Sequence, residues 1–166
     1  MARLAFVTGS LSHGGAERHA LGLANRLSER GHECHFVYVK PEAPLLEQLC
    51  LREGASVRCL DASRYLEPRA VGAFAAQLAR TDPDVVVAAN GYALTYAWLA
   101  LRLARRRTPL VVTFHSTRLL GAKERLQMLA YRPLFWSASC TVFVSERQRR
   151  NWLHRQRKST RLNSSN

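Results

Sequence analysis

The sequence has no long hydrophobic run, and its first residues do not form a targeting segment. The longest apolar stretch, residues 93–104, is interrupted by Arg102, whereas a membrane-spanning helix needs about 18 or more consecutive apolar residues. The residues after Met1 pass directly into a strand pattern, without the apolar core and small-residue cleavage site of a signal peptide. We therefore expect a cytoplasmic protein.

Paired cysteines are also absent. The four cysteines lie far apart and form no C-x-x-C motif, so neither a zinc site nor a redox pair is indicated. The segment 32–35, His-Glu-Cys-His, contains potential metal ligands. On a strand, however, neighbouring side chains point to opposite faces, so the four cannot converge on one ion. We expect no metal and no cofactor.

Acidic residues are scarce: 12 Asp and Glu stand against 25 Lys and Arg, for a net charge of +13. Such a balance raises nucleic acid or an anionic membrane as partners. The cations gather in residues 102–107 and from Arg147 onward, at expected helix ends where they complement the helix dipole without a ligand. There is no nucleic-acid recognition motif and no aromatic interleaving on a basic face. We expect no nucleic-acid partner, and peripheral membrane contact through the basic helix ends.

The last ten residues differ from the rest of the chain. Residues 157–166 have no apolar periodicity and a single large hydrophobic residue, so we predict that they are disordered. They also resemble the translation of a sequencing-adapter oligonucleotide, which points to a non-native tail. Residues 1–156 are long enough for one domain with a substantial core.

Short apolar runs alternate with segments of helical periodicity along the chain. This alternation predicts an α/β domain with a doubly wound parallel sheet, Rossmann-like, covered by helices on both faces. The expected strands are residues 3–8, 34–39, 56–60, 84–88, 110–114 and 140–144, and the expected helices are residues 16–29, 43–53, 69–80 and 92–105. Such sheets bind ligands at the carboxyl ends of their strands.

Two adjacent glycines, Gly14 and Gly15, stand between the first strand and the first helix. Glycines at a helix start let the backbone approach a ligand, and the free N–H groups favour an anion such as a phosphate. An ordinary tight turn is the alternative. The dinucleotide fingerprint G-x-G-x-x-G is absent, because Leu11 stands where the second glycine would be needed, and this argues against a nicotinamide cofactor.

Other polar residues follow the expected strands and should gather at the same rim. They are Glu17 and Arg18 after the first strand, Asn90 and Gly91 after the fourth, His115 after the fifth and Ser145 after the sixth. This is the composition of a polar binding cleft, although polar strand ends are also ordinary in loops.

The segment Gly14-Gly15-Ala16-Glu17-Arg18, followed by Leu23-Ala24-Asn25 and by Arg30-Gly31-His32-Glu33, resembles the amino-terminal domain of retaining glycosyltransferases of family 4. Weaker matches are Thr113-Phe114-His115 and Val144-Ser145-Glu146. The resemblance implies one half of an enzyme built from two Rossmann-like domains, the GT-B architecture. That half is the acceptor side, and the chain ends where the domain that holds the nucleotide-sugar donor would begin.

The resemblance also implies roles for the rim residues. Gly14 and Gly15 would approach the donor diphosphate, and His115 would be the catalytic residue, donating a hydrogen bond to the departing diphosphate. Asn90, Gly91 and Ser145 would contact the acceptor. Glu17 and Arg18 would either touch substrate or remain solvated structural charges, and Arg118 and Lys123 could meet an anionic acceptor.

The expected function is therefore the transfer of a sugar from a nucleotide-sugar to a glycan or lipid-linked acceptor, with the chain alone inactive. The alternative is a noncatalytic Rossmann-type module that binds a nucleotide or another anion.

Overall fold

The computed structural model describes residues 1–115 and 122–150, without the side chains of residues 122–128 and 130. Strands and helices alternate through this part of the chain. They are β1 (Arg3–Thr8), α1 (Gly15–Glu29), β2 (Glu33–Tyr38), the 3-10 turn η1 (Leu46–Gln48), β3 (Ser56–Cys59), α2 (Pro68–Thr81), β4 (Val85–Ala89), α3 (Asn90–Leu103), β5 (Leu110–Phe114), α4 (Ala122–Ser137) and β6 (Cys140–Phe143).

The six strands form one parallel sheet in the order β3-β2-β1-β4-β5-β6, which confirms the predicted doubly wound α/β fold. β2 and β3 follow β1 on one side of it, and the next strand, β4, lies on the other side of β1. The direction of winding therefore reverses between β1 and β4. In open parallel sheets the crevice at such a reversal, at the carboxyl ends of the strands, is the usual place for a ligand.

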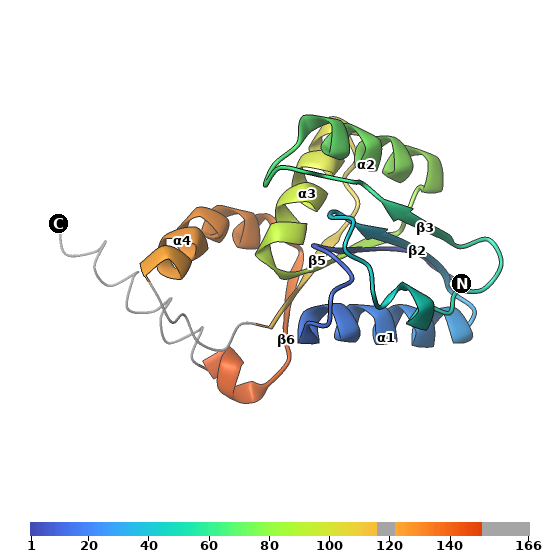
Figure 1. The fold of residues 1–166 in the computed structure, drawn as a ribbon, viewed down its shortest axis with the longest axis horizontal. Coiled ribbons are helices and arrows are strands. Elements are labelled where there is room, and N and C mark those ends of the chain that lie inside the picture. The colour runs from blue at the N-terminus through green and yellow to red at the C-terminus, as the bar shows by residue number, and fades with distance from the viewer. Residues whose placement is uncertain (116–121, 151–166) are drawn as a thin grey trace.

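Alternate residues of the strands face two separate cores. Leu4 and Phe6 pack with α1 on one face, whereas Ala5 and Val7 pack with α2 and α3 on the other. Figure 1 shows α1 beneath the sheet and α2 and α3 above it, with α4 beyond the edge at which the strands end. The nearly all-round apolar character of residues 92–105 is explained by this placement, because α3 lies between α2, α4 and the sheet.

The predicted helix at residues 43–53 is wrong, because the structure has only the turn η1 there. The leucine spacing still serves packing, since Leu45 is buried on the α1 face. The backbone forms short 3-10 bonds, such as the one from the Gln48 N–H to the Leu45 carbonyl at 3.1 Å, and α1 side chains hold the rest of the segment. The Asn25 amide donates to the Gln48 carbonyl at 2.8 Å and accepts from the Cys50 N–H at 2.9 Å, and the Ser28 hydroxyl accepts from the Arg52 N–H at 2.9 Å.

Helix α4 was not among the predicted elements. Parallel strands need a long crossover between them, so a helix between β5 and β6 follows from topology. Its sequence signal is weak, because Pro133 lies inside the helix and removes one helical hydrogen bond. The other strands and helices match their predicted positions to within two residues at each end.

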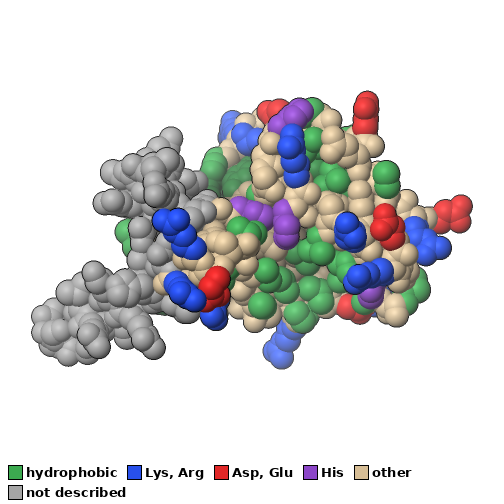
Figure 2. Space-filling view, turned by 90° about the horizontal axis from the view of Figure 1, so that it is seen from below, with side chains coloured by type: hydrophobic (Ala, Val, Ile, Leu, Met, Phe, Trp, Pro, Cys, Tyr) green, Lys and Arg blue, Asp and Glu red, His purple; other side chains and the backbone are tan. Residues whose placement is uncertain are grey.

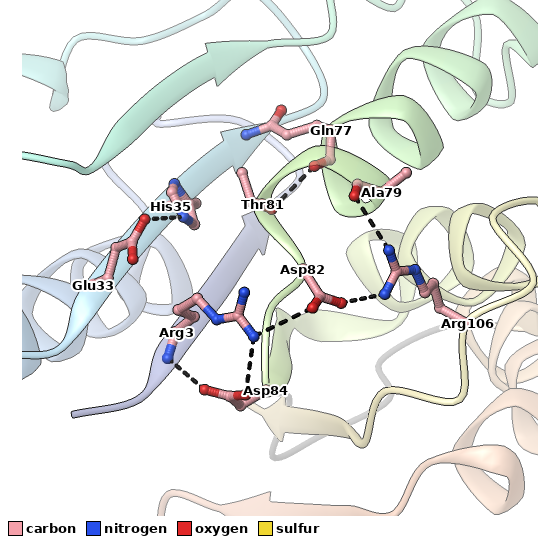
Figure 3. Close-up of polar contacts among 9 residues, drawn as sticks. All are labelled: Arg3, Glu33, His35, Gln77, Ala79, Thr81, Asp82, Asp84 and Arg106. Carbon is pink, nitrogen blue, oxygen red and sulfur yellow. Dashed lines mark hydrogen bonds and ion pairs between the residues drawn. The ribbon is translucent and has the colours of Figure 1, made fainter.

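The amino edge of the sheet, opposite the predicted rim, carries an ion-pair network (Figure 3). The Arg3 N–H donates to the Asp84 carboxylate at 2.7 Å, and the Arg3 guanidinium lies 3.3 Å from Asp82. Arg106 contacts Asp82 as well and donates to the Ala79 carbonyl at 3.2 Å. The network ties β1 to the ends of α2 and α3, so Arg106 has a structural role.

Candidate functional site

The two glycines at the start of α1 differ in their surroundings. Gly14 is the N-cap of the helix, and the Glu17 side chain folds back over it: a Cβ on Gly14 would lie 2.1 Å from Glu17 Oε2. Gly15 is exposed, and a Cβ there would meet no atom within 4 Å. The absence of a side chain at Gly14 is therefore explained by Glu17, whereas the open space at Gly15 leaves room for a ligand.

The two charges of the first turn also differ. The Glu17 carboxylate lies against the helix start, where the helix dipole favours a negative group. Arg18 is exposed, and its side chain has no partner among the described residues. The first is engaged structurally, and the second is available to a ligand.

His115 follows β5 and lies against α1. Its ring is 5.0 Å from the ring of His19, centroid to centroid, at an interplanar angle of 63°. The ring atom Nε2 is buried and has no hydrogen-bond partner among the described residues. Burial, and secondarily the neighbouring His19, lowers the pKa of His115 below its ordinary value of 6.5. His115 is therefore neutral near pH 7, with an N–H that can donate to a ligand.

Asn90 and Gly91 both have structural roles at the start of α3. Asn90 has a φ of 83°, and its side-chain oxygen accepts from the N–H groups of Tyr92 and Ala93 at 3.1 Å each, so it caps the helix. Gly91 is covered by the Tyr131 ring of α4, and a Cβ would lie 2.5 Å from that ring. The predicted acceptor contacts of Asn90 thus depend on the amide nitrogen, the part of its side chain that the cap does not use.

Ser145 follows β6, at the edge of the sheet. Its hydroxyl accepts from the Gln148 N–H at 3.2 Å, so it caps the turn that follows. In that turn Glu146 is paired with Arg149 and Arg150, and these two guanidinium groups lower the pKa of Glu146 to about 2. The strand order places Ser145 one strand further out than His115.

Together, the structure brings His115 into contact with the first turns of α1 through His19. In the strand order β4, which leads into Asn90 and Gly91 of α3, lies between β1 and β5. Sequence reasoning missed His19, which follows the glycine pair at helical spacing. It also missed Tyr65, Tyr92 and Tyr131, which gather near Gly9 and Gly91. Arg118, the side chain of Lys123 and the predicted tail at residues 157–166 lie outside the described residues.

Two further observations concern partners. Within the described part of the chain, no helix is long and apolar enough to cross a membrane. Figure 2 shows the α1 face, on which Lys and Arg side chains are dispersed among apolar and acidic ones without forming a continuous basic field.

A doubly wound parallel sheet with a glycine-led helix at its switch point defines a Rossmann-like domain with a polar rim. The family model of glycosyltransferase family 4 matches residues 13–162, and the chain belongs to that family. This confirms the resemblance drawn from the Gly14–Arg18 segment. No curated protein matches the chain.

Solved GT-B glycosyltransferases share the fold. Anabaena Alr3699/HepE in complex with UDP superposes with a TM-score of 0.70 at 22% identity, covering 92% of this chain and 40% of that one. The same protein in complex with UDP-glucose also has a TM-score of 0.70. Acinetobacter baumannii MurG has a TM-score of 0.62 at 15% identity, covering 86% and 41%. The chain thus spans about 40% of the length of these structures.

Proposed function

We propose that the chain is the acceptor-side half of a glycosyltransferase that moves a sugar from a nucleotide-sugar to a glycan or lipid-linked acceptor. The observation that carries this proposal is the meeting of His115 with α1, the helix that begins at Gly14 and Gly15. A diphosphate at the helix start would have free backbone N–H groups on one side and an imidazole close by. The nucleotide-bound state of HepE supports a nucleotide-sugar as donor.

In this proposal, Gly15 admits the donor diphosphate to the helix start, where the N–H groups and the helix dipole stabilise negative charge. Charge on the diphosphate grows as the sugar leaves, so a hydrogen bond from His115 strengthens in the transition state. Because Nε2 is buried, the donating atom is Nδ1, or Nε2 after the ring turns. No side chain of the chain need form a covalent bond, and the sugar is transferred with retention of configuration.

The donor sugar and base would be held by a second domain, since the GT-B relatives are more than twice as long as this chain. The chain alone is then inactive. This chain binds the acceptor and completes the phosphate site. The residues along the acceptor path are the Asn90 amide, Gly91, Ser145 and the exposed Arg18.

A chimera tests the proposal: the chain is joined to the donor domain of Anabaena HepE, and release of UDP from UDP-glucose is measured with and without candidate acceptors. We expect acceptor-dependent release that His115→Ala lowers about 100-fold or more, as loss of a group that stabilises a leaving anion does. His32→Ala, at the amino edge of the sheet, is the matched control and should retain activity.

The alternative function, a noncatalytic nucleotide- or anion-binding module, makes a different prediction for the same chimera. It would bind UDP or UDP-glucose without acceptor-dependent release, and His115→Ala would change binding alone. Full transfer activity in the His115→Ala chimera would reject the catalytic assignment.

A further inference from the structure

Four of the five tyrosines of the chain meet at one place, although they come from three separate segments. Tyr65 precedes α2, Tyr92 and Tyr96 lie in the first turns of α3, and Tyr131 lies in α4. The rings of Tyr65 and Tyr92 are 4.9 Å apart, and those of Tyr92 and Tyr96 are 5.3 Å apart. The hydroxyls of Tyr65 and Tyr131 are hydrogen-bonded to each other. We refer to these four residues as the tyrosine cluster.

The tyrosine cluster lies at the switch point of the sheet. A Cβ on Gly9, the residue after β1, would be 3.1 Å from the Tyr92 ring, and a Cβ on Gly91, two residues after β4 ends, would be 2.5 Å from the Tyr131 ring. Both glycines follow strands that flank the reversal of winding. The cluster therefore borders the crevice in which such folds bind ligands, on its α3 side, whereas His19 and His115 border the α1 side.

The members of the cluster are held in different ways. Tyr96 is fully buried, and its hydroxyl accepts from the Glu67 N–H at 3.0 Å and donates to the Tyr65 carbonyl at 3.4 Å. Burial and the neighbouring Tyr96 raise the pKa of Tyr92 far above its ordinary value, so Tyr92 stays neutral. These two side chains form a fixed base for Tyr65.

Tyr65 is the exposed member of the cluster. Its side chain is 54% exposed, and the next residue, Leu66, is 46% exposed. The ring is nevertheless fixed, with Tyr92 against it and Tyr131 bonded to its hydroxyl. An exposed aromatic ring that is held by a neighbouring ring and by a hydrogen bond to its hydroxyl contributes little buried area to the core. It does offer a rigid apolar face to a ligand at low entropic cost.

The charges around the cluster indicate what kind of ligand this face suits. Glu42 is held to the loop after β1, because its carbonyl accepts from the Leu11 N–H at 2.8 Å, two residues after the Gly9 that contacts the Tyr92 ring. Its side chain is exposed there, and a carboxylate can accept from sugar hydroxyls. The Glu67 carboxylate accepts from the Ser63 N–H at 2.9 Å and from its hydroxyl at 3.3 Å, and these bonds, with a smaller effect of the nearby cation Arg64, lower the pKa of Glu67. A neutral sugar, with C–H groups for the ring and hydroxyls for a carboxylate, fits these surroundings better than a phosphate does.

We propose that the tyrosine cluster forms an acceptor subsite in which a neutral pyranose ring stacks on Tyr65, with a hydroxyl directed toward Glu42. This subsite rests on the proposed function for its role in transfer. As a binding site it belongs to the 166-residue chain itself and requires no second domain.

Saturation-transfer NMR on the chain, with methyl α-glucopyranoside, methyl α-galactopyranoside and methyl α-mannopyranoside as probes, tests the subsite. We expect at least one of them to bind with a millimolar dissociation constant and to receive saturation from the tyrosine rings. Tyr65→Ala should weaken that binding about fivefold, the size of one aromatic contact. Leu103→Ala, 61% exposed at the far end of α3, is the matched control and should bind as the wild type does.

Tyr65→Ala removes the hydrogen bond to Tyr131 of α4 as well as the ring. A second variant therefore separates the effect of that hydrogen bond from the effect of stacking. Tyr131→Phe removes the hydroxyl contact and leaves both rings, and it should weaken binding about twofold, less than Tyr65→Ala does. Amide spectra check that each variant is folded.

The outcomes separate the subsite from the proposed function. Absence of binding by all three glycosides, equal binding by Tyr65→Ala, or tighter binding of glucose 6-phosphate than of the neutral sugars would overturn the subsite. If instead the glycosides bind as expected and the chimera with the HepE donor domain releases no UDP, the proposed function fails and the subsite stands. In an active chimera, Tyr65→Ala should raise the acceptor KM with little change in kcat.

Discussion

At the scale of single residues, Gly14 and Gly15 look equivalent in the sequence and are not equivalent in the structure. Glu17 covers Gly14, whereas Gly15 faces open space in the first turn of α1. The sequence places both glycines at a helix start. It does not show why each position is a glycine, because that depends on the orientation of the Glu17 side chain. The predicted roles of these glycines and of His115 remain predictions that substitution can test.

Gly15→Ala should raise the stability of the chain and lower transfer in the chimera. Alanine removes the conformational freedom of glycine in the unfolded state, which stabilises the helix by about 0.5–1 kcal/mol, but its methyl group enters the space proposed for the diphosphate. Urea unfolding and UDP release measure the two effects. A variant that is more stable and fully active would show that no ligand approaches Gly15.

Gly14→Ala provides the contrast, because it should destabilise the chain. Its methyl group overlaps the Glu17 carboxylate, the far end of a flexible side chain, and moving that charge away from the helix start costs about 0.3–1 kcal/mol. In the Glu17→Ala background the same substitution should cost less, which a double-mutant cycle of unfolding free energies measures. Equal costs in both backgrounds would contradict the contact.

His35, which sequence reasoning considered only as a metal ligand, is a buried titratable group on β2. Its Nδ1 lies 2.9 Å from the Ser56 hydroxyl. Its Nε2 lies 3.1 Å from Glu33, the contact drawn in Figure 3. Burial lowers its pKa from 6.5; Arg80 and Arg3 act in the same direction, and Glu33 opposes them. The folded chain thus binds this proton less readily than the unfolded chain does.

Stability should therefore fall in acid through His35. The contribution of the neutral ring is fully present above pH 6.5 and is lost as the pH falls below 6.5 toward the lower pKa of the folded state, because the unfolded state binds more protons in that window. Urea unfolding at pH 7.5, 6.5 and 5.5 measures this loss. His35→Gln should show a flatter pH dependence than the wild type, and an identical slope in the two proteins would contradict it.

At the scale of elements, the sequence predicted what depends on local periodicity and missed what depends on tertiary contact. The strands were found because each is a short apolar run between turn residues. The segment 43–53 has the leucine spacing of a helix, yet α1 supplies its hydrogen-bond partners from the side. The tyrosine cluster and the contact of His19 with His115 join residues far apart in the chain, so no local pattern could reveal them.

The role of α1 in holding the segment 43–53 predicts the effect of Asn25→Ala. The substitution removes two hydrogen bonds, to the Gln48 carbonyl and from the Cys50 N–H, and should lower the unfolding free energy by about 1–2 kcal/mol. Amide hydrogen exchange should rise at residues 46–52 and stay unchanged in α2. Arg26→Ala, its neighbour in α1, is the matched control. If η1 stays protected in Asn25→Ala, the helix side chains do not hold the segment.

At the scale of the whole molecule, the basic charge divides between the two edges of the sheet. At the amino edge, Arg102 stacks on Trp98 and Arg106 is paired with Asp82, while Arg105 and Arg107 are exposed. At the carboxyl edge, Arg149 and Arg150 are paired with Glu146. Arg18 and Arg147 at that edge are exposed. Paired cations contribute less to a membrane contact, so the exposed ones should carry it.

Sedimentation with vesicles that contain 30% anionic lipid tests the predicted membrane contact and identifies the edge responsible. We expect binding at low salt that weakens as salt rises, because exposed charges more than about 10 Å apart are screened at about 0.1 M ionic strength. Arg105→Glu with Arg107→Glu reverses the amino edge, and Arg18→Glu with Arg147→Glu reverses the carboxyl edge. A contact that presents the polar rim to a lipid-linked acceptor must depend on the exposed cations of that edge, and Arg18 and Arg147 both lie there. If the amino-edge pair of substitutions removes binding and the carboxyl-edge pair does not, the rim does not face the membrane, which contradicts a lipid-linked acceptor held in this way.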